Sequence, residues 1–159
     1  MSTIAFLGLG HMGGPMAKNL VAAGHTVRGY DPVPEAVAAA QANGVTTFGT
    51  GAEAVAEADV VVTMLPNGTL VKQVYAELLP AAPKGSLFID SSTISVDDAR
   101  EAHAMATEHG HLQIDAPVSG GVKGADAGTL AFMVGGSDEE FAAAGPVLEP
   151  MAGKVIHCG

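Results

Sequence analysis

Three glycines near the N-terminus, Gly8, Gly10 and Gly13, constrain the fold of this chain more than any other feature of its sequence. They follow an apolar stretch of strand length, residues 3–8, and precede a segment with helical periodicity, residues 12–24. A second strand-like stretch, residues 26–31, completes a strand–helix–strand unit. The spacing G-x-G-x-x-G is weak evidence in a chain with 21 glycines. Its position between a strand and a helix is the context that indicates dinucleotide binding.

Each glycine has a separate physical task in such a unit. Gly8 permits the tight turn out of the strand, Gly10 leaves room for a pyrophosphate, and Gly13 lets the helix pack closely on the strand. The free N–H groups at the start of the helix, together with its dipole, attract the phosphates. Asp31 ends the second strand, 21 residues after Gly10, where a carboxylate accepts hydrogen bonds from ribose hydroxyls. Because that carboxylate would repel a 2′-phosphate, we expect NAD rather than NADP as the cofactor.

Length, charge and cysteine content limit the kinds of protein that this chain can be. The length of 159 residues suits one domain with a sizeable core. A net charge of −10 disfavours binding to nucleic acid. The only cysteine, Cys158, fits a reducing compartment, and the sequence has no signal-peptide pattern and no long apolar run. We therefore expect a cytoplasmic protein with no membrane partner.

Apolar stretches of strand length alternate with helical patterns along the chain, which predicts an α/β fold of the Rossmann type. Such a fold is a doubly wound, mostly parallel sheet with helices on both faces. The predicted helices span residues 12–24, 31–44, 51–58, 68–80, 95–110 and 137–145, the last ended by Gly145 and Pro146. The predicted strands span residues 3–8, 26–31, 59–65, 86–90, 112–116, 129–136 and 154–159. Capping boxes are expected at Ser95 with Asp98 and at Ser137 with Glu140.

Other chemistries fit the sequence less well. The stretch VSGG, residues 118–121, is not a G-x-S-x-G motif and does not lead straight into a predicted helix, which disfavours a serine hydrolase. The six histidines are scattered without metal-ligand spacing, so no metal site is expected. Ser119, Gly120 and Gly121 could instead present a hydroxyl and successive N–H groups to a substrate carboxylate. Lys123 is the only lysine near them, and we expect it to be a solvated loop residue.

Several stretches together resemble a known family, the β-hydroxyacid dehydrogenases, and within it the members that oxidise 3-hydroxyisobutyrate. The matching stretches are FLGLGHMGGPMAKNL, TMLPNG, GSLFIDSSTIS, DAPVSGGVKGADAGTLAFMVGG and MAGKVIHCG. The resemblance implies oxidation of (S)-3-hydroxyisobutyrate to methylmalonate semialdehyde with NAD, a step of valine catabolism. The cofactor contacts that it implies are Gly8, Leu9, Gly10, His11, Met12, Gly13, Asp31, Leu65, Pro66 and Thr93. The substrate contacts that it implies are Ser119, Gly120 and Gly121.

The family pattern also extends past this sequence. In the family, the catalytic lysine follows the position of Gly159, and a helical C-terminal domain completes the pocket. We therefore expect residues 1–159 to be a dinucleotide-binding domain, without a catalytic residue or turnover of its own, from a homo-oligomeric enzyme. Two alternatives remain open: a tartronate semialdehyde or glyoxylate reductase of the same family, and a non-catalytic dinucleotide-binding module.

Overall fold

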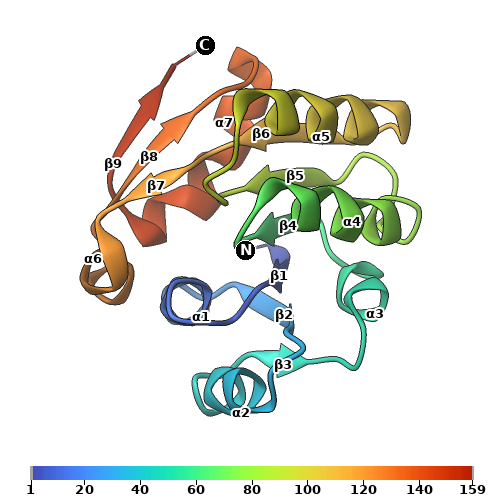
Figure 1. Cartoon of the computed structure of the whole chain (residues 1–159). Coiled ribbons are helices and arrows are strands. Elements are labelled where there is room, and N and C mark those ends of the chain that lie inside the picture. The colour runs from blue at the N-terminus through green and yellow to red at the C-terminus, as the bar shows by residue number, and fades with distance from the viewer. Residues whose placement is uncertain (1, 159) are drawn as a thin grey trace.

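A parallel sheet of six strands forms the centre of the molecule (Figure 1). The computed structural model describes residues 2–158. The strands lie in the order β3-β2-β1-β4-β5-β6, and every neighbouring pair is parallel. Their bounds are β1 (Thr3–Leu7), β2 (Thr26–Tyr30), β3 (Thr46–Thr47), β4 (Val60–Thr63), β5 (Leu87–Asp90) and β6 (Leu112–Asp115). This order confirms the predicted doubly wound fold, in which the chain direction across the sheet reverses between β1 and β4.

Helices cover both faces of this sheet, and each face has its own hydrophobic core. The helices α1 (Gly13–Ala22), α2 (Pro34–Ala42) and α7 (Asp138–Leu148) supply residues to one core. The other core lies beneath α3 (Gly51–Val55), α4 (Gly68–Leu78) and α5 (Val96–Glu108). Side chains alternate between the faces along each strand, so Val60 and Val62 join the first core while Val61 joins the second. Burial on both faces explains why the central strands are continuous apolar runs.

The last part of the chain forms a second, three-stranded sheet that the sequence analysis did not predict. It contains β7 (Val118–Ser119), β8 (Leu130–Val134) and β9 (Ala152–His157) in the order β7-β8-β9. Strand β7 is antiparallel to β8, and β8 is parallel to β9. A bridge between Asp115 and Gly135 connects this sheet to the end of β6. The expected strand over residues 154–159 corresponds to β9, although Gly159 lies outside the described residues.

Two helix predictions near the C-terminal end were wrong. Helix α6 (Gly121–Ala127) begins directly after Gly120, so the VSGG stretch does lead into a helix. Helix α7 does not end at Gly145 but continues through Pro146 to Leu148, and η1 (Glu149–Met151) follows it. Leu148 and its neighbour Val147 are buried in the core. Their burial outweighs the loss of one helical hydrogen bond at the proline.

The two predicted capping boxes differ in the structure. Ser137 and Glu140 form the complete box, with Glu140 N–H donating to Ser137 Oγ (3.1 Å) and Ser137 N–H donating to Glu140 Oε1 (3.0 Å). At the start of α5 only half of the box is present: Asp98 N–H donates to Ser95 Oγ (3.1 Å). The Asp98 carboxylate is paired with Lys72 of α4 (2.9 Å), so this carboxylate ties two helices together. Over residues 2–158, no helix combines the length and the apolar character that crossing a membrane requires.

Candidate functional site: the carboxyl edge of the sheet

The residues predicted to contact a cofactor lie in the loops at the carboxyl edge of the large sheet. The glycine loop joins β1 to α1, Asp31 follows β2, Leu65 and Pro66 follow β4, and Thr93 follows β5. The strand ends are in register across this edge, where Leu7 pairs with both Tyr30 and Thr63. In an open α/β sheet, this edge is where ligands bind, in the crevice beside the strand pair at which the order reverses.

The backbone of the glycine loop requires glycine at two positions. Gly8 has a φ of +100°, which residues with a side chain rarely adopt, and a Cβ there would overlap the carbonyl oxygen of Met64, the residue that follows β4. A Cβ on Gly13 would overlap the carbonyl oxygen of Gly8. Gly13 therefore sets how closely α1 approaches the turn.

Gly10 differs from both neighbours because nothing in the chain lies within 4 Å of the position that its Cβ would occupy. The fold itself gives no steric reason for a glycine at this position. The space lies beside the start of α1, whose first turn carries no acidic residue. The N-terminal end of a helix favours a negative charge through its free N–H groups and its dipole. Gly10 thus leaves a space suited to a phosphate.

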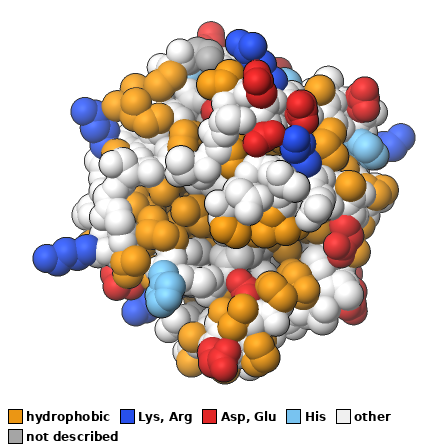
Figure 2. Space-filling view, viewed as in Figure 1, with side chains coloured by type: hydrophobic (Ala, Val, Ile, Leu, Met, Phe, Trp, Pro, Cys, Tyr) orange, Lys and Arg blue, Asp and Glu red, His pale blue; other side chains and the backbone are white. Residues whose placement is uncertain are grey.

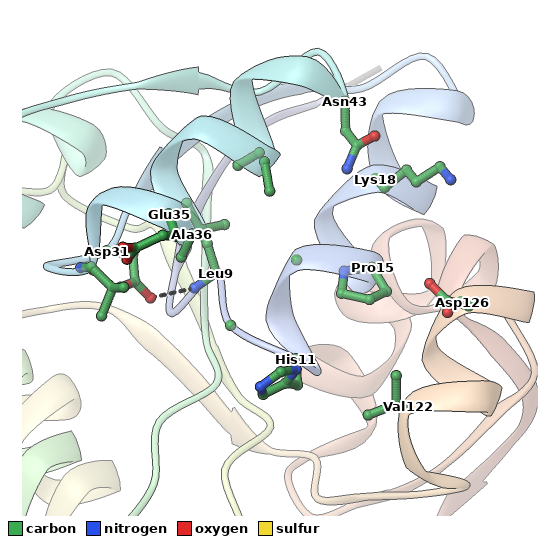
Figure 3. Close-up of a pocket in the computed structure, with 15 residues that line it drawn as sticks. Leu9, His11, Pro15, Lys18, Asp31, Glu35, Ala36, Asn43, Val122 and Asp126 are labelled. Carbon is green, nitrogen blue, oxygen red and sulfur yellow. Dashed lines mark hydrogen bonds between the residues drawn. The ribbon is translucent and has the colours of Figure 1, made fainter.

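Asp31 joins the glycine loop to the loop that follows β2. Its Oδ2 accepts a hydrogen bond from Leu9 N–H (2.8 Å), which is drawn as a dashed line in Figure 3, and its Oδ1 accepts one from Val33 N–H (2.8 Å). A carboxylate has about four acceptor positions, so two remain for other donors such as hydroxyl groups. Leu9 itself is 2% exposed and packs in the core, so its side chain belongs to the fold.

A cleft of about 460 Å³ opens where the strand order reverses. Five of the predicted cofactor residues line it: Gly8, Gly10, Asp31, Leu65 and Pro66. The opposite wall was not predicted from the sequence; α4 supplies it through Leu70, Val74, Glu77 and Leu78. Their spacing of three and four residues marks one face of a helix, but periodicity alone does not tell a ligand wall from a core face. The cleft is thus mainly apolar, with the Asp31 carboxylate at one side.

The loops after β4 and β5 are held together by buried polar groups. Leu65 N–H donates to Ser92 Oγ (2.8 Å), and Asp90 Oδ1 accepts from Thr63 Oγ1 (2.8 Å) and from Ser92 N–H (3.2 Å). Asp90 is 1% exposed, and its Oδ2 has no hydrogen-bond partner among the described residues. Burial raises the pKa of Asp90, against the hydrogen bonds from Ser92 and Thr63, and the like charge of Asp115 raises it further. Asp90 is not among the site residues predicted from the sequence.

A second groove, of about 630 Å³, lies between α1, α2 and α6 on the outer side of the glycine loop (Figure 3). His11 and Val122 both line it, which places the start of α6 beside the glycine loop. Met12 packs partly against the core. His11 therefore lies on the side of the loop away from the α4 wall of the cleft.

The predicted carboxylate anchor is a turn between β7 and α6. Ser119, Gly120 and Gly121 are exposed, and the two glycines have φ values of +133° and +62°. A Cβ on Gly120 would lie 3.2 Å from Leu130 Cδ2. These residues do not line the 460 Å³ cleft. Lys123, expected in a loop, lies within α6, where it is exposed. Across residues 2–158, no cluster of three or more His, Cys, Asp or Glu side chains is arranged to hold a metal ion.

The surface of this region is rich in hydrophobic side chains. Figure 2 shows them gathered across the middle of the face seen in Figure 1, with the charged groups mostly around its margin. Val33 and Val122, which flank the second groove, are 48% and 46% exposed. Apolar surface concentrated in this way marks a place for a ligand or for another protein surface.

Comparison with protein families gives one match across nearly the whole chain. Residues 3–159 match the family described as the NAD binding domain of 6-phosphogluconate dehydrogenase. A probable 3-hydroxyisobutyrate dehydrogenase of Mycobacterium tuberculosis is 66% identical over all 159 residues, which correspond to 54% of that relative. An NAD-dependent L-serine dehydrogenase of Pseudomonas aeruginosa is 45% identical, again over 100% of this chain and 54% of the relative.

A solved structure agrees closely with the fold. The structure of the M. tuberculosis 3-hydroxyisobutyrate dehydrogenase with L-serine superimposes with a TM-score of 0.99 at 66% identity. The superposition covers 100% of this chain and 55% of that one. The chain therefore spans about half the length of the relatives that it matches.

Proposed function

This chain belongs to the family of NAD-binding domains typified by 6-phosphogluconate dehydrogenase, and from this premise we propose that it is the cofactor domain of an NAD-dependent 3-hydroxyacid dehydrogenase. The substrate that we propose is (S)-3-hydroxyisobutyrate, oxidised to methylmalonate semialdehyde. Bound NAD would accept a hydride from the carbon that carries the hydroxyl group. The residues of this chain bind and orient the cofactor and the acid.

One observation carries the cofactor assignment: Gly10, which has empty space at its Cβ position, and Asp31 line the same cleft. In a dinucleotide-binding fold, the pyrophosphate lies at the glycine loop and the adenosine ribose lies at the acidic residue that ends the second strand. Leu65 and Pro66 line the same cleft from the second half of the sheet, and Thr93 lies in the neighbouring loop. We assign these three residues to the nicotinamide half of the cofactor.

The preference for NAD is tested by titrating the chain with NAD and with NADP. The Asp31 carboxylate would lie beside the 2′-phosphate of NADP, and one unfavourable charge contact is worth on the order of 1–3 kcal/mol. We therefore expect NAD to bind about 5- to 150-fold more tightly. NADP binding that equals or exceeds NAD binding would refute the role given to Asp31.

We further propose that Ser119, Gly120 and Gly121 hold the substrate carboxylate in a longer enzyme. These residues are exposed, and hydroxyl and N–H groups are donors of the kind that a carboxylate needs. The anchor and the cleft form one site only if the rest of the substrate pocket bridges them. We assign the rest of the substrate pocket and the acid–base lysine to a further domain. That domain would pack on the hydrophobic side chains that Figure 2 shows across the middle of this face.

The dependence on a further domain is tested by measuring NADH formation from 3-hydroxyisobutyrate, with residues 1–159 alone and with a chain as long as its relatives. We expect weak NAD binding without turnover from the short chain. Proton transfer by a positioned group contributes about 10²- to 10⁴-fold, and lost positioning of the substrate adds to the deficit. Robust turnover by residues 1–159 would contradict this proposal and would make Lys123 the first residue to substitute.

L-serine is a second candidate substrate, because two of the similar proteins are named with it. It is also a 3-hydroxy acid, and the same carboxylate anchor would serve both. The two candidates differ only at the second carbon, which bears an amino group in serine and a methyl group in 3-hydroxyisobutyrate. A direct comparison of kcat/KM for the two acids, made with the longer chain, decides between them.

A further inference from the structure

At the carboxyl edge of the sheet, the residues of β4, β5 and β6 change from apolar to polar at the last position of each strand. The last residues of these strands, Thr63, Asp90 and Asp115, are polar and pair in register. The residues one position earlier, Val62, Ile89 and Ile114, are apolar and fully buried. A carboxyl group at the 1%-exposed position of Asp90 is costly to bury. A valine or isoleucine there would serve the sheet equally well, so the carboxyl group has a task other than strand stability.

The contacts of Asp90 define that task. Its Oδ1 accepts from Thr63 Oγ1 at the end of β4 and from Ser92 N–H in the loop after β5. Ser92 is also buried, and its Oγ accepts from Leu65 N–H. The carboxyl group thus orients Ser92, and Ser92 orients the backbone at Leu65. Two loops, distant in sequence, are thus fixed to each other through the side chains of Asp90 and Ser92.

The loop after β4 lines the cleft, and the loop after β5 lies next to it. Leu65 and Pro66 line the cleft directly, and Thr93 is the exposed residue next to the buried Ser92. The strands that carry these loops belong to the half of the sheet opposite β2 and Asp31. In a doubly wound fold, this second half receives the second mononucleotide. The network of Asp90 therefore lies under the nicotinamide side of the proposed cofactor site, and not under its adenosine side.

We propose that Asp90 is a positioning residue for the nicotinamide half of the dinucleotide, acting through Ser92 on the backbone of Leu65 and on Thr93. This inference rests on the proposed binding of NAD in the cleft. Asp90 is 1% exposed, so it would act without touching the cofactor. Its contribution is to hold the two loops in one arrangement before the cofactor arrives, which reduces the ordering cost of binding.

The experiment compares two ligands, NAD and ADP-ribose, by calorimetric titration of residues 1–159. ADP-ribose has the adenosine, the pyrophosphate and the second ribose but lacks the nicotinamide ring. Ser92→Ala removes the acceptor for Leu65 N–H and should weaken NAD about 10-fold while changing the affinity for ADP-ribose less than twofold. That loss is the size expected for one hydrogen bond that orders a loop. Asp90→Ala should give the same selective loss.

Asp90→Asn is the matched rescue, because the amide oxygen can still accept from Thr63 and from Ser92 N–H. It should bind both ligands within twofold of the unsubstituted chain. His111→Gln controls for destabilisation alone. His111 is buried on the same face of the sheet, but its Nε2 contacts Leu79 O (2.8 Å), away from both loops. This control should change neither affinity.

The outcomes separate this role from the proposed function. A selective loss of NAD affinity in Ser92→Ala, with rescue in Asp90→Asn, supports the positioning role. Equal weakening of NAD and ADP-ribose, or unchanged NAD affinity in Ser92→Ala, would overturn it while leaving NAD binding in place. An unsubstituted chain that binds neither ligand would overturn the proposed function and this role with it.

Discussion

Substituting the glycines of the loop one at a time should separate the needs of the fold from the needs of the cofactor. Gly10→Ala adds a methyl group where the chain has nothing within 4 Å. Gly13→Ala adds the same group where it would overlap the backbone oxygen of Gly8. The two variants therefore carry the same substitution three positions apart, one into empty space and one into backbone. We expect Gly10→Ala to keep its stability and lose affinity for NAD. We expect the main effect of Gly13→Ala to be a loss of stability.

The magnitudes follow from these surroundings. At Gly10 the alanine methyl meets no atom of the fold, and a Gly→Ala change at a compatible position alters stability by about 0 to +1 kcal/mol through the unfolded chain. At Gly13 the obstructing atom is backbone and cannot rotate away. The cost should therefore reach the upper end of the overpacking range, about 3 kcal/mol. For a domain of this size, that corresponds to a fall of about 6–12 °C in Tm.

Two measurements on each variant test this reasoning. Thermal unfolding without ligand gives Tm, and calorimetric titration gives the Kd for NAD. Gly10→Ala should keep its Tm within about 3 °C, whereas its Kd should rise at least 10-fold, about 1.4 kcal/mol, because the methyl group occupies the proposed pyrophosphate space. Unchanged NAD affinity in Gly10→Ala would mean that the cofactor does not approach this residue. A Gly13→Ala variant as stable as the original chain would refute the close-packing argument.

Three further predictions concern other parts of the site. Asp31→Ala should weaken NAD and narrow its advantage over NADP, because it removes the ribose acceptor and the charge that would repel a 2′-phosphate, and it also leaves Leu9 N–H without its acceptor; an unchanged ratio of the two dissociation constants, by titration, would refute the charge argument. Asp90→Asn should become more stable relative to the original chain as the pH rises above about 4. Burial raises the pKa of Asp90 in the folded chain above its value in the unfolded chain, so the original chain loses stability as the pH rises toward the folded-state pKa, whereas asparagine does not titrate. Denaturant unfolding from pH 4 to 8 should show the difference in unfolding free energy between the two chains widening. In a chain as long as its relatives, Gly120→Val should raise the KM for the hydroxy acid at least 10-fold and leave the NAD affinity within twofold, because φ at Gly120 is +133° and the added side chain would block the proposed anchor; an unchanged KM would remove this turn from the substrate site.

Local patterns in the sequence were enough to predict most of the helices and strands of this protein. Alternation of buried strands with amphipathic helices predicted six helices and most of the sheet, because these periodicities arise from contacts within one element and its nearest neighbours. The packing tasks of Gly8 and Gly13 were readable for the same reason, because they depend on a strand end, a turn and a helix start. The phosphate role of Gly10 and the ribose role of Asp31 stay predictions, made from their spacing along the chain.

Some local predictions failed where a distant contact outweighed the local signal. Gly145 and Pro146 are strong signals for the end of a helix, yet α7 continues to Leu148 because that residue is buried against the sheet. The carboxylate of Asp98 pairs with Lys72 of another helix instead of completing its own capping box. Neither partner is visible in the sequence around the residue concerned.

Which residues meet in the site depends on how segments far apart in the chain pack together. The wall that α4 gives to the cleft, and the position of the Ser119–Gly121 turn outside it, depend on how separate units pack. The Asp90 network joins residues 27 positions apart through side chains that local patterns describe only as strand ends. Hydrogen bonds between a buried carboxyl group and a distant loop leave no periodic trace, because each partner is a single residue whose position is set by strand register. Local sequence patterns thus specified most of the helices and strands, and the packing of these elements specified which loops come together at the cleft.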